Sequence, residues 1–241
     1  MSKSLKLFLG IFYIIILCLF LYLIFSYVDV TRLDDFLYYK ELQSNLEKMI
    51  GNNLYKNLFI FFFFCIIWVS LLGFGSPLLI ISGILFGQWI GTFISVLSIS
   101  VGALILYSIA NFFFKDLVYH YLEKRFIKYI HLFKKNEFNY FLAFRLSGGL
   151  GIPFGPQNVL PVIFNMKKSN YFFASFLGFI PIFFIWNTIG SGLNEYIKQA
   201  DNFSFINLLL NKEIYLPIIL FVIVMLISII IKKRIFGNKN L

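Results

Sequence analysis

The chain has 241 residues, of which 60% are hydrophobic and only 13% are charged. Soluble domains carry about 25% charged residues, so this composition excludes an ordinary soluble protein and predicts an integral membrane protein. The net charge of +10 is concentrated beside the apolar segments. Membrane topology explains that placement, which indicates anionic lipid headgroups as partners and argues against nucleic acid.

The first predicted element is a transmembrane helix over residues 7–28, an uncharged run that follows Lys3 and Lys6. The run is too long for the apolar region of a signal peptide, and no small-residue cleavage site follows it, so we expect it to be retained. The next loop, residues 29–56, holds five acidic and four basic residues. By the positive-inside rule this loop faces outward and the N-terminus is cytoplasmic. Part of the loop, 32–50, is expected to be helical.

Residues 57–114 carry no charge, and Gly73-Phe-Gly-Ser-Pro77 interrupts them. We predict a re-entrant hairpin in which 58–72 enters from outside, turns near mid-depth, and 78–86 returns to the same side. Residues 88–114 then cross once. Two full spans before residue 88 would require eleven residues to cross, although they rise only about 16 Å, half of a bilayer core. The alternative is that Pro77 and Pro153 kink two ordinary helices.

The loop 115–137 has six basic and three acidic residues, which predicts a cytoplasmic location. Within it, the apolar residues of 117–133 recur at helical spacing, so we expect an amphipathic helix on the cytoplasmic surface. His120 and His131 lie on this helix. We interpret both as solvated, because no cluster of histidine, cysteine or carboxylate residues indicates a metal site.

The second half repeats the hairpin pattern from the opposite face, through a turn over 148–156 and a full span over 171–189. The loop 191–213 is expected outside, and a last span over 215–231 ends at basic residues that place the C-terminus in the cytoplasm. The predicted fold is an all-α polytopic membrane protein with about four transmembrane helices, two oppositely entering re-entrant helical hairpins (an inverted repeat) and a cytoplasmic amphipathic helix. The predicted domains are an N-terminal helix with its outer loop (1–57), a core (58–193), and an outer loop with the C-terminal helix (194–241).

The chemistry available at membrane depth is narrow. No acidic residue occurs between Glu47 and Asp116, or between Glu137 and Glu195. This pattern excludes a carboxylate proton relay in the hairpins and argues against an enzyme, so we expect no catalytic residue, metal or cofactor. Paired glycine- and proline-interrupted segments are, in contrast, typical of a transport site at the bilayer midplane.

Arg145 is the one cation predicted at membrane depth. Burying it in a bilayer costs from about 2.5 to above 10 kcal/mol, so such residues usually face a wet cavity and mark a pathway. The N-termini of the half-helices after Pro77 and near Gln157 would direct free N–H groups to the same depth, which predicts a site for phosphate. Alternatively, Arg145 lies shallow and snorkels to the cytoplasmic headgroups. The candidate substrate-binding residues are Arg145, Asn158, Gly148, Gly149, Pro153, Pro156, Pro77, Gly83 and Gly87.

Small residues recur in the helix that begins near Gln88, and they allow helix backbones to approach closely. They are Gly87, Gly91, Ser95, Ser98, Gly102 and Ala103. This face could serve internal packing or a homodimer, and internal packing is the simpler explanation.

The ordered series of motifs over about 58–193 resembles the DedA / SNARE-associated Golgi protein superfamily, whose shared core is the VTT domain. The matching positions are the segment 73–87, Gly91, Gly102-Ala103, Phe141, Arg145-Leu146, Pro153-Phe154, Asn158, Pro161, Leu177-Gly178, Pro181 and 190–193. The chain looks closer to the branch of Golgi vesicle proteins, because classical DedA members carry acidic residues at membrane depth and this chain has none. Its high Phe, Ile, Lys and Asn content favours an AT-rich bacterial genome and an inner-membrane location.

The resemblance implies a protein that translocates or scrambles anionic lipids, either phospholipids or polyprenyl phosphates, between leaflets. Two other functions stay open from the sequence. One is a transporter of a small anion or solute, which the same half-helix geometry would suit. The other is a non-transporting membrane protein of assembly or homeostasis.

Overall fold

The computed structural model describes residues 15, 18, 19 and 22, and then 36–71, 74–200, 204–212, 214–223 and 226. Within these residues every regular element is a helix and no strand occurs, which confirms the all-helical prediction. The chain forms two compact units, residues 1–46 and residues 47–241. Apart from four positions, the predicted span 7–28 lies outside the described residues, as does the end of the span 215–231.

Helix α2 (Phe36–Asn52) confirms that most of the segment 32–50 is helical. Helix α3 (Leu54–Ser70) starts at Asn53, whose side chain accepts the Lys56 backbone N–H at 3.1 Å, a standard N-cap bond. The buried residues of α3 are Phe61, Cys65 and Val69. Their spacing of four puts them on one face, and this face packs on the following helix.

Helix α4 (Gly75–Lys135) is interrupted once, at Gly87, where φ is 72° and ψ is 176°. Only glycine adopts this backbone conformation readily, so the break falls where the sequence supplies it. It separates a short arm, 75–86, from a long arm that begins at Gln88. The sequence predicts the same division, between a hairpin arm over 78–86 and a crossing helix over 88–114. Beyond residue 114, however, α4 continues to Lys135 without a further break, so the expected amphipathic segment is not a separate helix. Its side chains at 116–132 lie outside the described part of the chain.

The second half is built from shorter pieces. Helix α5 (Glu137–Leu146) is followed by the 3-10 turn η2 (Gly148–Gly151), α6 (Phe154–Val159) and the 3-10 turn η3 (Leu160–Phe164). Three residues of the turn, Gly148, Gly149 and Gly151, have φ values of 68°, 73° and 81°. Side chains disfavour this region, so the glycine-rich sequence permits the reversal after Arg145. Helix α7 (Lys168–Gln199), α8 (Phe205–Leu210) and a helix over Ile214–Ile223 complete the fold.

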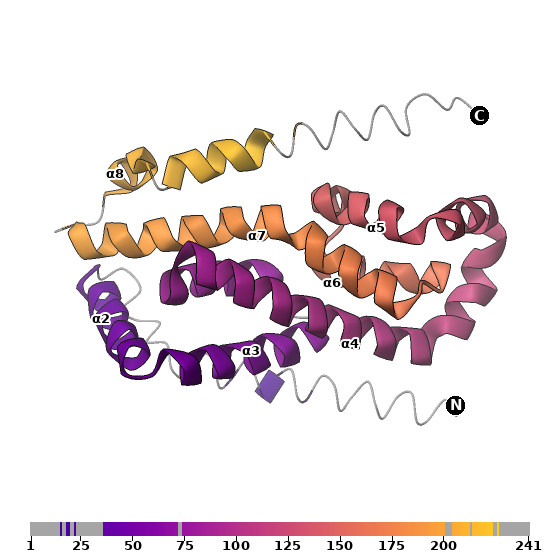
Figure 1. Ribbon diagram of the computed structural model, residues 1–241, viewed down its shortest axis with the longest axis horizontal. Coiled ribbons are helices and arrows are strands. Elements are labelled where there is room, and N and C mark those ends of the chain that lie inside the picture. The colour runs from indigo at the N-terminus through magenta and orange to yellow at the C-terminus, as the bar shows by residue number, and fades with distance from the viewer. Residues whose placement is uncertain are drawn as a thin grey trace. The chain divides into compact units, whose positions relative to one another are not determined.

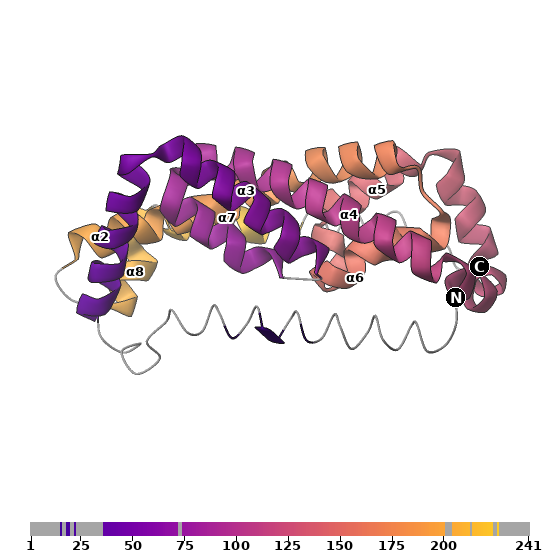
Figure 2. The same ribbon diagram turned by 90° about the horizontal axis from the view of Figure 1, so that it is seen from below.

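Helices α4 and α7 run side by side and form the largest interface between elements (Figures 1 and 2). The contact is close because a Cβ at Gly83 would overlap the carbonyl group of Asn187, and one at Gly190 would overlap that of Ile80. Ser82 of the short arm bonds Asn187 across this interface, and it bonds Ser95 of the long arm of α4 at 2.7 Å. Gly91 likewise packs against Asn187, and Gly102 packs against α3. The small-residue face therefore serves packing within the chain.

Among the described residues, two helical stretches are long and apolar enough to cross a bilayer, Gly75–Phe113 and Lys168–Gln199. Each contains one helix-disturbing residue, Gly87 in the first and Pro181 in the second. Helices α3 and α4 flank the first predicted turn, and helices α5 and α6 flank the second. The number of full crossings and the re-entrant depth stay predictions.

Candidate functional site

Arg145 lies in the last turn of α5 and is only 2% exposed. Its guanidinium donates to four side-chain oxygens from α6 and α7. The acceptors are Ser175 Oγ at 3.3 Å, Gln157 Oε1 at 3.3 Å, Asn158 Oδ1 at 2.6 Å and Tyr171 Oη at 3.0 Å. The side chain therefore ties the second predicted hairpin to α7, and it is enclosed by protein rather than extended to headgroups.

Aromatic rings enclose the same guanidinium. Its Cζ lies 4.7 Å from the ring centre of Phe141, 4.6 Å from that of Phe179 and 5.7 Å from that of Tyr171. The ring faces carry partial negative charge and stabilise a buried cation. Within the described part of the chain, no carboxylate makes an ion pair with Arg145. Neutral oxygens and rings therefore hold the positive charge without neutralising it.

Hydrogen-bond donors outnumber acceptors around Arg145. A guanidinium has five N–H groups, and both Nη2 hydrogens and the Nε hydrogen are used, whereas Nη1 makes one bond. The Nδ2 atom of Asn158 is buried and has no partner among the described residues. Rotating this amide would not help, because Asn158 Oδ1 already accepts from Arg145 Nη2. The cluster can therefore accommodate a further group that is rich in acceptors.

The glycine turn η2 positions the Gln157 side chain, which is one of the acceptors around Arg145. Gln157 Nε2 donates to the Gly148 carbonyl at 3.3 Å and to the Ile152 carbonyl, which directs its Oε1 to Arg145. A Cβ at Gly149 would overlap the Gln157 side chain, and one at Gly178 would overlap Arg145 Cβ. The two glycines therefore allow the turn and α7 to close around the polar side chains.

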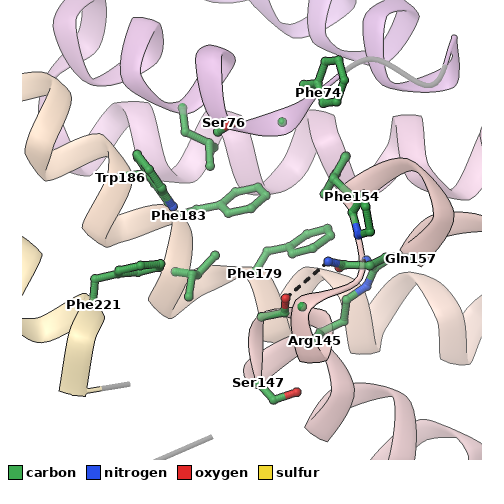
Figure 3. Close-up of a pocket in the computed structure, with 16 residues that line it drawn as sticks. Phe74, Ser76, Arg145, Ser147, Phe154, Gln157, Phe179, Phe183, Trp186 and Phe221 are labelled. Atoms are coloured by element: carbon green, nitrogen blue, oxygen red, sulfur yellow. Dashed lines mark hydrogen bonds between the residues drawn. The ribbon is translucent and has the colours of Figure 1, made fainter. Parts of the chain in front are cut away.

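A cavity of about 390 Å³ lies next to Arg145, and both predicted turns contribute to its wall (Figure 3). The first turn of α4 supplies Phe74 to Ser76, and the second turn supplies residues from Ser147 to Gln157. The two segments nearly touch, because a Cβ at Gly75 would lie 3.5 Å from the Phe154 ring.

The two ends of the cavity differ in chemistry. Arg145, Gln157 and Ser147 gather at one end, whereas Phe183, Trp186 and Phe221 lie toward the other (Figure 3). The N-terminus of α4 also borders the cavity, and its cap residue Phe74 makes no side-chain cap bond. The cavity thus joins a cationic, donor-rich end to an aromatic wall. This combination suits an amphipathic molecule with an anionic group.

The structure places the predicted site residues in three groups. Arg145, Gly148 and Pro153 line the cavity, while Asn158 and Gly149 lie behind its polar end, against Arg145 and Gln157. The rest do not line this cavity: Gly83 is a packing residue of the α4–α7 interface, Gly87 is the break in α4, and Pro77 and Pro156 are exposed.

Sequence reasoning missed the partners of Arg145 on α7. Tyr171, Ser175 and Phe179 recur every four residues on one face of this helix, opposite Arg145. The spacing was a detectable signal for a partly polar helix face. It could not indicate which other segment this face contacts.

Comparison with protein families matches residues 71–192 to the VTT domain. The match includes the α4–α7 interface, both turns and every residue that lines the cavity except Phe221. No solved structure matches this chain.

Proposed function

This chain belongs to the VTT domain family, and we propose that it moves anionic lipids, phospholipids or polyprenyl phosphates, between the two leaflets of a membrane. Members of the family are membrane proteins associated with transport and lipids, and the two long apolar helices agree with an integral membrane protein. For this chain we infer the bacterial inner membrane and, within the superfamily, the branch of Golgi vesicle proteins.

The observation that carries the proposal is the amphipathic cavity. A lipid phosphate crossing a bilayer needs a cation and hydrogen-bond donors that replace water. Arg145, with its spare Nη1 hydrogen, offers both at one end of the cavity. A small anion would need only this polar end. The wall of Phe179, Phe183 and Trp186 adds an apolar surface for the lipid chain, which favours a lipid over a soluble anion.

The residues around Arg145 determine how the lipid headgroup binds. Before a lipid arrives, four neutral acceptors hold the guanidinium in place and orient it, so little side-chain entropy is lost on binding. The phosphate oxygens accept from Nη1 and approach the N-terminus of α4, while the Phe154 ring closes against Gly75. No bond of the lipid breaks, so we assign no catalytic residue.

The test blocks the cavity without touching Arg145. Ser76 is exposed and lines the cavity, so Ser76→Trp places a large ring in the path. Ser169 is also exposed, lies at the start of α7 away from this cavity, and provides the matched control Ser169→Trp. Each protein is reconstituted in liposomes, and exchange of fluorescent phosphatidylglycerol between leaflets is measured.

We expect wild type and Ser169→Trp to exchange the lipid equally fast, and Ser76→Trp to be at least about tenfold slower, the effect of roughly 1.4 kcal/mol on the barrier. Equal rates for all three proteins would contradict the cavity as the path. Phosphate uptake without lipid exchange would instead identify a small-anion transporter. Neither activity, in protein shown to be folded, would identify a non-transporting assembly protein.

A further inference from the structure

A second cavity, of about 430 Å³, lies at the opposite end of α5 from Arg145. The end of α4 and the start of α5 form one side, with Lys134 and Lys135, and the segment that enters α7 forms the other, with Asn165, Lys167 and Asn170. We call it the basic cleft. Eight residues of α5 separate Glu137 in this cleft from Arg145, about 12 Å along the helix.

The basic cleft carries a net positive charge because three lysines outnumber its one carboxylate, Glu137. Both Glu137 oxygens accept the backbone N–H of Lys167, at 3.2 and 3.4 Å, and Oε1 also accepts from Asn170 at 2.6 Å. Glu137 thus ties the start of α5 to the residues at the start of α7. Lys134, Lys135 and Lys167 are exposed and make no ion pair with any described residue. Three lysines around a hollow can therefore bind an external anion.

Aromatic side chains border the same end of the fold. Phe133 stacks on Phe164 with ring centres 4.3 Å apart, and on Tyr140 at 6.3 Å. Tyr140 is 49% exposed. Aromatic residues beside lysines at helix ends are typical of the boundary between hydrocarbon and headgroups. This combination favours the phosphate of a lipid headgroup over free phosphate as the anion.

We propose that the basic cleft is a second anion site, which binds the phosphate of a lipid headgroup at the membrane surface. The lysine ammonium groups contact the phosphate, and the asparagine amides of Asn165 and Asn170 lie beside it. The site is distinct from the Arg145 cavity, since the two share no lining residue. The proposal therefore stands or fails independently of the transport function.

The test compares two triple variants with the same loss of charge. In the first, Lys134, Lys135 and Lys167 are replaced by glutamine. In the control, Lys48, Lys56 and Lys212 are replaced by glutamine; these three are also exposed and lie outside the basic cleft. Native mass spectrometry of the full chain in detergent then measures binding of phosphatidylglycerol and phosphatidylcholine, with and without inorganic phosphate as competitor.

Each surface lysine contributes about fivefold to the binding of an anionic headgroup. We expect the cleft variant to bind phosphatidylglycerol at least about tenfold more weakly than wild type. The control variant should bind this lipid as wild type does. Phosphatidylcholine should bind to all three proteins with the same affinity. The same loss is expected in the Ser76→Trp background, where the first cavity is blocked.

Three results would overturn the proposal. Equal losses in the two triple variants would indicate general charge rather than a site. Displacement of the lipid by millimolar inorganic phosphate would indicate a soluble ligand. Disappearance of the difference in the Ser76→Trp background would assign the bound lipid to the cavity at Arg145.

Discussion

The two stacked tyrosines near Arg145 provide a matched pair of substitutions. Tyr107 and Tyr171 are both fully buried, with ring centres 4.6 Å apart and planes within 10°. The Tyr107 hydroxyl donates to the Met166 carbonyl at 2.6 Å. The Tyr171 hydroxyl donates to the Asn158 carbonyl at 3.2 Å and also accepts from Arg145. Replacing either by phenylalanine keeps the ring and removes the hydroxyl alone.

The expected magnitudes follow from the partners. Tyr107→Phe removes one neutral hydrogen bond, which costs about 1 kcal/mol. Tyr171→Phe removes a neutral bond and a bond to a charged group, which is worth about 1.5–3 kcal/mol by itself. We therefore expect Tyr171→Phe to be less stable than Tyr107→Phe by about 2 kcal/mol. For a chain of this size that difference lowers the Tm by about 4–8 °C.

Thermal unfolding of the purified proteins in detergent, followed by tryptophan fluorescence, measures the difference. Equal Tm values for the two variants would refute the reasoning, because they would show that the bond to the guanidinium adds nothing.

The glycines give two further predictions. Gly83→Ala should lower the Tm by several degrees, since its Cβ would overlap the Asn187 carbonyl, whereas Gly51→Ala, with nothing within 4 Å, should leave the Tm unchanged or raise it; equal shifts would contradict the close approach of α4 and α7. Gly87→Ala should cost about 1–3 kcal/mol although nothing lies within 4 Å of its Cβ, because φ is +72°. A chemical denaturation curve would show this, and an unchanged midpoint would mean that α4 is not broken there.

The breaks in the helices could be predicted because single residues determine them. Gly87 and the group from Gly148 to Gly151 permit backbone angles that other residues disfavour, so their places are visible in the sequence. The uninterrupted passage of α4 beyond residue 114 was not predicted. Charged residues there led us to expect a loop with a separate amphipathic helix over 117–133, but charge determines which side of a membrane a segment occupies and does not end a helix.

The partners of Arg145 could not be predicted for a different reason. The lack of acidic residues between Glu137 and Glu195 was visible in the sequence and excluded a carboxylate partner for Arg145 from that stretch. Which neutral groups replace the carboxylate depends on how α7 is placed against α5. That placement follows from Gly178, where a Cβ would overlap Arg145 Cβ. One glycine in a helix does not reveal its neighbour.

The most direct test of the central claim measures how substitutions of Arg145 change the exchange rates of lipids that differ in charge. Arg145→Gln keeps a polar side chain and removes the cation, while Arg145→Lys keeps the cation and loses the forked donors. In the liposome assay, wild type should exchange phosphatidylglycerol faster than phosphatidylcholine. This preference should persist in part in Arg145→Lys and fall at least about tenfold in Arg145→Gln, the loss of one charge-assisted bond. An unchanged preference in folded Arg145→Gln protein would contradict the account.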